Sequence, residues 1–313
     1  MTRDRNLLRF LLLCVIWGMT WIGVKAGVEV VPPLLFAGSR FMTAGFVLLA
    51  AGWLCGHFPP VARRDWPRLA ATSLLMISCC YAPLYWGMVY VDSGTAAVLE
   101  MSLTPITLMA FALLLGEEAF DCRRVGAILL GICGLLILFG PTAYANWVLP
   151  PAGGGSGVMR LLGAAAVAVA ALAYGWGSIA ARPLLRTYPS LLVAGLTTFI
   201  GGATLLVLSV AAEPGAVDAL SGRWGLAAWS GWLFLVLFGS LVGYTIYMRL
   251  LRDIGATRAG AYAFVSPVVA VLLGMAFFGE RIHPLDVAGM AVMLGAAALA
   301  MFEPARRKSP AGA

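Results

Sequence analysis

The chain has 313 residues, of which 61% are hydrophobic and only 11% are charged, and its mean hydropathy is +0.93. Because soluble domains contain about 25% charged residues, this composition excludes an ordinary soluble protein and indicates a membrane protein. The net charge of +7 fits cationic loops beside a membrane, so it does not require nucleic-acid binding.

In chain order, the sequence contains ten apolar stretches. They cover about residues 10 to 28, 33 to 55, 69 to 90, 95 to 115, 124 to 140, 160 to 181, 189 to 211, 226 to 248, 259 to 279 and 285 to 302. Most are near the roughly 20 residues that cross a hydrocarbon core. The first stretch lacks a small-residue cleavage site, so we expect an uncleaved helix. The sequence therefore predicts an all-α polytopic membrane protein with ten transmembrane helices.

The distribution of arginine and lysine predicts the orientation in the membrane. Positive residues are retained on the cytoplasmic side. With the N-terminus inside, 16 of the 21 Lys and Arg residues fall in cytoplasmic segments, four fall on the opposite side, and Arg40 lies within a span. We therefore expect both termini in the cytoplasm.

The second half of the chain repeats motifs of the first. PITLMAFALLLGEE, which begins at Pro105, is matched by PVVAVLLGMAFFGE, which begins at Pro267. Other pairs recur in the same order: Trp17-Gly18 and Tyr174-Gly175, Lys25 and Arg182, and Asp92-Ser93-Gly94 and Asp253-Ile254-Gly255. The offsets lie between 157 and 162 residues. A duplication of this kind is typical of transporter architecture.

Five helices per repeat is an odd number, so the second repeat must enter the membrane from the opposite side. Such inverted repeats enclose a site near the midplane. The predicted units are residues 1–141 for the first five-helix repeat, 142–158 for a flexible external linker, 159–303 for the second, inverted five-helix repeat and 304–313 for a basic cytoplasmic tail. The linker is uncharged and rich in Pro and Gly, which predicts flexibility.

The two repeats resemble those of the EamA-type drug/metabolite transporters. Each has an aromatic-Gly pair, a cation eight residues later, and a Pro followed by Gly-Glu about twelve residues on; the resemblance covers about residues 7 to 303. Among the branches of this superfamily, the amino-acid exporters of the YddG type are most similar.

This resemblance implies a secondary transporter of the bacterial inner membrane. Such a protein exports small metabolites from the cytoplasm by alternating access through a central cavity, without ATP. Aromatic and neutral amino acids are the first expected substrates. A multidrug or organic-cation exporter of the same fold is the alternative within transport.

Two prolines lie near the middle of equivalent predicted helices. A proline inside a helix removes one backbone hydrogen bond, so Pro105 frees the carbonyl of Met101 and Pro267 frees that of Ala263. The prolines thus predict helix breaks or hinges. The freed carbonyls either accept hydrogen bonds from a substrate ammonium group or bond to neighbouring helices.

Two ionisable residues, Arg40 and Glu100, fall inside predicted membrane spans, where a charge is costly and indicates function. At about 1.5 Å of rise per residue, both lie roughly 10 Å from the same membrane face. They either neutralise each other or contact substrate, Arg40 through a carboxylate and Glu100 through a proton or an ammonium group. The equivalent positions in the second repeat fall near Thr197 and Tyr262, which carry no charge.

Aromatic side chains form the third set of candidates for a substrate cavity. Rings with polar tips suit a cavity for amphipathic or aromatic solutes, and they also act as anchors at membrane interfaces. The candidates are Trp17, Trp21, Tyr81, Tyr85, Trp86, Trp176, Tyr244, Tyr247 and Tyr262.

Charged residues at the predicted helix ends have two readings. Lys25 and Arg182 either fix helix depth as snorkelling cations or form gating contacts. The acids that follow the proline helices are expected to pair with nearby arginines: Glu117, Glu118 and Glu280 with Arg124 or Arg281.

Enzymatic and metal-dependent functions find little support in the sequence. It contains no nucleotide-binding P-loop, its two histidines, His57 and His283, are predicted on opposite sides of the membrane, and its six cysteines show no CxxC spacing. We therefore expect no enzyme, no cofactor and no metal site. An intramembrane enzyme, the alternative outside transport, would need a clustered acid, base or metal set. The expected partners are a small-molecule substrate and the lipid bilayer, without nucleic acid, and the expected state is a monomer.

Overall fold

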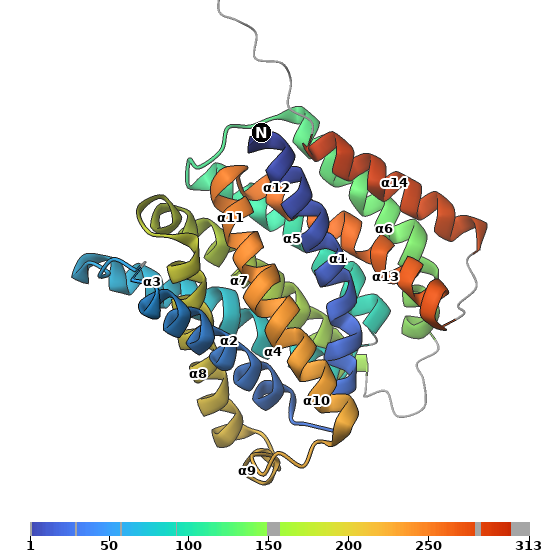
Figure 1. Cartoon of the computed structure of the whole chain (residues 1–313). Helices are drawn as coiled ribbons and strands as arrows, with labels where there is room; N and C mark the ends of the chain where they lie inside the picture. The colour runs from blue at the N-terminus through green and yellow to red at the C-terminus, as the bar shows by residue number, and fades with distance from the viewer. Residues whose placement is uncertain are drawn as a thin grey trace, which may run out of the picture.

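The computed structural model of the chain describes residues 2–28, 30–56, 58–91, 93–148, 157–278 and 283–301. Within these ranges every regular element is a helix and no strand is found. Figure 1 shows most of the long helices running side by side in a bundle. The all-α fold expected from the sequence is confirmed.

The helices of the first half are α1 (Thr2–Val28), α2 (Pro33–Leu54), η1 (Arg63–Asp65), α3 (Trp66–Ser73), η2 (Leu74–Ser78), α4 (Cys79–Met88), α5 (Ser93–Leu114) and α6 (Cys122–Val148). Those of the second half are α7 (Gly157–Thr187), α8 (Ser190–Ala212), α9 (Ala216–Ala219), α10 (Gly225–Phe234), η3 (Leu235–Tyr244), α11 (Thr245–Asp253), α12 (Ala256–Gly260), α13 (Tyr262–Phe278) and α14 (Pro284–Met301). We call the end of the bundle where α1 begins the N-terminal end, and the opposite end, where α6 ends, the linker end.

Nine helical segments of the described chain are long and apolar enough to cross a membrane. Several elements join into single crossings: α3, η2 and α4 in one, and α10, η3 and α11 in another. α1 is 27 residues long but is not among the nine. The chain is therefore a polytopic membrane protein, and the count of ten crossings stays a prediction.

Helices of the two halves pack on each other in reciprocal pairs. α2 packs along α8, and α6 packs along α14 (Figure 1). α4 and α5 pack on α7, whereas α10 and α13 pack on α1. Under the predicted duplication, α7 corresponds to α1, α13 to α5, and the crossing that contains α10 to the crossing that contains α4, so the contacts of the crossings match. Such reciprocity is what a two-fold relation between the halves produces.

The pair of α2 and α8 shows that equivalent helices run in opposite directions. The backbone N–H groups of Leu34 and Leu35, in the first turn of α2, donate hydrogen bonds to the carboxylate of Glu213 at 2.8 and 3.1 Å. Glu213 directly follows the last residue of α8. The carboxylate thus satisfies backbone donors that have no partner inside the helix, and it fixes the start of α2 beside the end of α8.

Two π-helical segments occupy equivalent positions in the two halves. η2 starts at Leu74 and η3 starts at Leu235, which is the same offset of 161 residues that separates Asp92 from Asp253. π-Helical turns are rare and are frequent at functional sites. The sequence analysis did not predict them, because no residue type marks them.

The predicted domain boundaries fall partly outside the described residues. α6 continues to Val148 and α7 begins at Gly157. Of the expected linker, residues 149–156 are therefore outside the described part of the chain, and so is the whole expected tail at 304–313. The boundaries of the two repeats stay a prediction.

Candidate functional site

A cavity of about 100 Å³ lies between the two halves of the bundle. Its wall combines α1, α2, α4 and α5 of the first half with α7, η3 and α13 of the second. It is lined by Trp17, Thr20, Val24, Arg40, Phe41, Cys80, Tyr81, Leu84, Tyr85, Glu100, Met101, Tyr174, Gly239, Tyr244, Tyr262 and Ser266. We call it the central cavity.

Aromatic rings in contact with one another form much of this wall. The rings of Trp17 and Tyr262 meet edge to face with centroids 4.6 Å apart. Tyr81 packs in the same way on Phe41, at 4.6 Å, and on Tyr85, at 5.8 Å. Edge-to-face pairs at these distances are favourable. The wall is therefore apolar on its faces and carries hydroxyl groups at its edges.

The π-helical segment η3 contributes both a backbone group and a side chain to the central cavity. The indole N–H of Trp17 donates a hydrogen bond to the carbonyl of Gly239, at 3.3 Å. The Tyr244 hydroxyl lies 3.3 Å from that of Thr197 and donates to the sulfur of Met76, at 3.5 Å. Trp17 on α1 is thus tied to a segment whose backbone departs from α-helical bonding.

Arg40 is buried in this wall, with only 5% of its surface exposed. Its guanidinium carbon lies 4.2 Å from the ring centroid of Phe41 and 5.3 Å from that of Tyr81. Both distances suit cation–π attraction. The Nε and Nη1 atoms of Arg40 are buried and have no hydrogen-bond partner.

Glu100 lines the same cavity from α5. Among the ion pairs of the described residues, none joins it to Arg40 within 4.0 Å. The mutually neutralising pair that the sequence left open is therefore not formed in this structure.

The second half supplies no charge to the central cavity at the equivalent positions. Thr197, which corresponds to Arg40, is fully buried and donates its hydroxyl to the carbonyl of Val193 at 2.8 Å. Tyr262, which corresponds to Glu100, lines the cavity. The only charged residues that line it within the described chain are Arg40 and Glu100.

Four of the sequence candidates are not among the residues that line the cavity. Tyr247 is fully buried behind it, with its hydroxyl 2.9 Å from Ser178 Oγ. Trp86 and Trp176 are 44% and 50% exposed on the outside of the bundle, where they pack on Tyr90 and Phe111. Ala263 is buried without lining the cavity, and the side chain of Trp21 lies outside the described part of the chain.

The two prolines are differently placed with respect to the cavity. Pro105 lies inside α5 and Pro267 inside α13, and both helices continue through the proline, so the expected hinges stay a prediction. Met101, whose carbonyl Pro105 frees, lines the cavity, whereas Ala263 does not. Only the first of the two freed carbonyls therefore belongs to a residue of the wall.

Sequence reasoning missed several residues of the wall, above all Tyr174. It is the repeat counterpart of Trp17, which was a candidate, so the duplication itself carried the signal. Ser266 precedes Pro267, and its counterpart Thr104 was not a candidate either. Phe41 and Cys80 carry no sequence signal, because nothing distinguishes them from other apolar residues of a membrane helix.

A second cavity, of about 190 Å³, lies next to the first. It is lined by Val24, Val28, Pro33, Tyr85, Met88 and Val89. Val24 and Tyr85 line both cavities. Val28 ends α1 and Pro33 begins α2, so this second cavity lies between the central cavity and the linker end.

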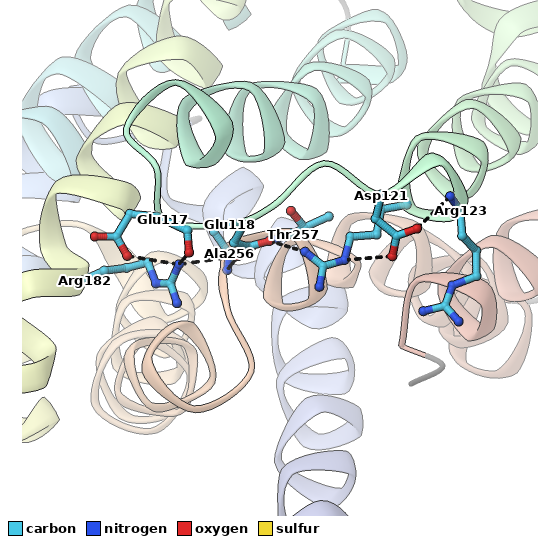
Figure 2. A network of polar contacts seen from close by, with 8 residues as sticks. Glu117, Glu118, Asp121, Arg123, Arg182, Ala256 and Thr257 are labelled. Carbon is cyan, nitrogen blue, oxygen red and sulfur yellow. Dashed lines mark hydrogen bonds and ion pairs between the residues drawn. The ribbon is translucent and has the colours of Figure 1, made fainter. Parts of the chain in front are cut away.

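The N-terminal end of the bundle is crossed by a cluster of ion pairs (Figure 2). The carboxylate of Glu118, 9% exposed, lies 2.6 Å from Nη1 of Arg124 and 3.6 Å from Nη1 of Arg182. It also accepts hydrogen bonds from the backbone N–H groups of Ala256, at 2.5 Å, and Thr257, at 3.3 Å. One carboxylate thus connects the end of α5 with α6, α7 and α12.

Glu117 extends this cluster. Its carboxylate pairs with Arg182 at 3.3 Å and with Arg186, and its backbone carbonyl accepts a hydrogen bond from Arg182 at 3.1 Å. At the same end, Arg9 of α1 pairs with Asp253 of α11 at 3.3 Å. The expected pairing of Glu118 with Arg124 is confirmed. The side chain of Lys25 and the residues Glu280 and Arg281 lie outside the described part of the chain.

The cluster joins two motifs that recur in both halves. Glu118 follows the Gly-Glu motif of the first half, and Ala256 follows the Asp-Ile-Gly motif of the second. Gly255 has a positive φ of 88°, and a Cβ atom there would lie 2.6 Å from Oε1 of Glu118. Glycine is therefore required at this position both by the backbone and by the carboxylate.

No group of three or more His, Cys, Asp or Glu residues that could hold a metal ion is found in the described ranges. The polar groups that line the central cavity are instead one guanidinium, one carboxylate and several hydroxyls. These groups can bind a small polar or charged solute by hydrogen bonds and ion pairs.

A cavity lined by two sets of membrane-crossing helices is the arrangement found in membrane transporters built from two repeats. The chain belongs to the EamA-like transporter family, whose sequence profile matches residues 6–140 and 161–302. The resemblance found in the sequence is confirmed.

Curated relatives are similar over nearly the whole chain. The uncharacterized inner membrane transporter YedA of Escherichia coli K12 is 30% identical, over 92% of this chain and 87% of YedA. Protein PecM of Dickeya dadantii is 26% identical, over 90% and 87%. A solved crystal structure superposes with a TM-score of 0.76 at 20% identity, covering 95% of this chain and 96% of the other. This last likeness concerns the fold alone.

Proposed function

We propose that the protein exports small amphipathic metabolites from the cytoplasm, with aromatic and neutral amino acids as the first substrates. The observation that carries this proposal is the content of the central cavity: a wall of aromatic rings with one guanidinium and one carboxyl group, those of Arg40 and Glu100, which form no ion pair within 4.0 Å. A zwitterion with an apolar side chain matches such a wall in charge and in polarity.

The size of the cavity favours small metabolites over bulky drugs. Its volume of about 100 Å³ is below the roughly 300 to 1,000 Å³ of pockets that hold drug-sized ligands. A multidrug or organic-cation exporter, the second candidate, would gain nothing from Arg40, because a buried cation repels a cationic solute.

The mechanism we propose is alternating access. The ion pairs of Glu117 and Glu118 with Arg182 tie the halves together at the N-terminal end, while the second cavity extends from the central cavity toward the linker end. This asymmetry supports a state that is closed at one face and prepared to open at the other. Rocking of one half against the other would reverse it.

We assign the N-terminal end to the cytoplasm of a bacterial inner membrane. The arginine content of this end supports the assignment, because cytoplasmic segments carry an excess of Arg and Lys. Both halves of the cavity wall come from one chain, so we expect a monomer to be sufficient for transport.

The proposal is tested with the purified protein in liposomes loaded with labelled amino acids. Saturable efflux that is stimulated by unlabelled amino acid on the other side supports a carrier. Arg40→Gln should lower this efflux, and Arg223→Gln, which removes an exposed cation at the linker end, is the matched control and should transport like the wild type. Absence of efflux across a broad panel of amino acids would refute the substrate, and non-saturating flux without counterflow would indicate a channel.

A further inference from the structure

The buried guanidinium of Arg40 lacks the acceptors that a buried charge requires. A guanidinium removed from water is destabilising unless it is paired and hydrogen-bonded. Phe41 and Tyr81 contact it through their rings, but a ring face does not replace a hydrogen-bond acceptor for the N–H groups in the guanidinium plane. Nε and Nη1 are left without a partner. Two donor nitrogens of this guanidinium are thus buried without an acceptor within hydrogen-bond distance.

A third donor lies on the same cavity. The hydroxyl of Tyr85 is buried and has no hydrogen-bond partner, and its ring packs edge to face on Tyr81, 5.8 Å away. Arg40 and Tyr85 both contact Tyr81 and both line the central cavity. Arg40 and Tyr85 therefore supply three buried donors without a partner to the wall of one cavity.

The ligand that fits three such donors is a carboxylate. The guanidinium edge presents two N–H groups in a fixed plane that matches the two oxygens of a carboxylate. A phosphate dianion would bring two negative charges into a cavity whose wall already holds the carboxyl group of Glu100, and like charges in a buried site repel strongly. A carboxylate brings only one negative charge, so this repulsion is smaller.

We propose that Arg40 and Tyr85 form a carboxylate-binding subsite that every substrate of this transporter must occupy. This inference rests on the proposed function and names the group by which the substrate is recognised. Tyr85 lines both cavities, so the carboxylate lies on the side of the central cavity that faces the linker end. The apolar part of the substrate then faces the rings of Trp17, Tyr244 and Tyr262.

The experiment measures ligand binding directly, apart from transport. Thermal unfolding and calorimetric titration of the detergent-purified protein use three probes that share one phenyl group: L-phenylalanine, 3-phenylpropionate, which lacks the amine, and phenethylamine, which lacks the carboxylate. We expect both carboxylates to bind and to raise the unfolding temperature, and phenethylamine to have no effect.

Four variants assign this binding to the subsite. Arg40→Gln should weaken both carboxylates by at least about tenfold, because a hydrogen bond to a charged group is lost. Arg40→Lys keeps the positive charge but not the planar guanidinium edge. Its affinity for both carboxylates should therefore lie between that of the wild type and that of Arg40→Gln. Tyr85→Phe removes one hydroxyl and should weaken binding several-fold. Arg223→Gln should bind like the wild type.

The outcomes separate this inference from the proposed function. Binding of phenethylamine as tight as that of phenylalanine, unchanged affinity in Arg40→Gln, or no binding of either carboxylate would each overturn the subsite. If Arg40→Gln does not fold, the two conservative variants still test the subsite. Arg40→Lys keeps the positive charge, and Tyr85→Phe keeps nearly the same side-chain shape. Carboxylate binding that depends on Arg40 without any amino-acid flux in liposomes would retain the subsite and refute the export of amino acids.

Discussion

Glu118 at the end of the first proline helix accepts a hydrogen bond from the backbone N–H of Ala256 at 2.5 Å. These residues belong to different halves of the chain and are 138 positions apart. Because the same carboxylate also pairs with Arg124 and Arg182, it ties α12 of the second half to α5, and through these arginines to α6 and α7. The contact joins the two halves at the N-terminal end, and under the proposed alternating access it would have to break for this end to open.

Glu118→Ala is expected to favour opening of the N-terminal end. Loss of its charge-assisted hydrogen bonds, at about 1.5 to 3 kcal/mol each, should shift the equilibrium by at least about tenfold. Cys80 is a native reporter, because it lines the central cavity with 4% of its surface exposed. In a protein that keeps only this cysteine, a small thiol reagent added from the N-terminal end should react faster when Glu118 is replaced.

The matched control for this variant is Asp218→Asn, which alters an exposed acid at the linker end. Its Cys80 should react at the wild-type rate. Equal reactivity of Cys80 in the wild type and in Glu118→Ala would show that this carboxylate does not hold the end closed.

Gly255→Ala should lower the free energy of unfolding more than Gly225→Ala. Both glycines have positive φ, 88° and 82°, and a side chain in such a conformation is destabilising by about 1 to 3 kcal/mol. Only at Gly255 does the new methyl also meet the carboxylate of Glu118, since nothing lies within 4 Å at Gly225. Denaturant unfolding in detergent measures both variants. Equal losses would contradict a role for Glu118 in the conformation of this turn.

The hydroxyls of Tyr247 and Ser178, 2.9 Å apart, are predicted to stabilise the fold without contacting substrate. Hydrogen bonds between membrane helices contribute about 0.6 kcal/mol on average and at most about 1.7. A double-mutant cycle of Tyr247→Phe and Ser178→Ala should give a coupling energy in this range. The order of substrate preference should be unchanged, and a changed order would place Tyr247 in the binding site.

Trp86→Leu and Trp176→Leu should transport like the wild type, whereas Tyr81→Leu should not. The two tryptophans are on the outside of the bundle. At such positions a leucine side chain contacts lipid as favourably as a tryptophan side chain does. Tyr81 instead packs on Phe41 and contacts the guanidinium of Arg40. Initial efflux rates, normalised to protein in the liposome membrane, measure the difference. A strong defect in Trp176→Leu would indicate that this face of α7 binds a substrate or a partner.

The sequence alone determined the helices, their duplication and the two charges inside the membrane. These follow from local properties: the length of apolar stretches, the position of Pro105 and Pro267, and the cost of placing Arg40 or Glu100 in hydrocarbon. The predicted spans agree closely with the helices, as at α2 and α8. Length and hydropathy are sufficient here because every crossing has to satisfy its backbone within a helix.

Which face of each helix points inward was decided only by the tertiary structure. Lipid is as apolar as the interior, so hydropathy does not distinguish the outward Trp86 from the inward Tyr85 next to it. The π-helical segments η2 and η3 further change the rotation of the residues that follow them. The contact of Glu118 with Ala256 likewise depends on how the halves pack. Sequence therefore identified the motifs, and packing decided which of them meet.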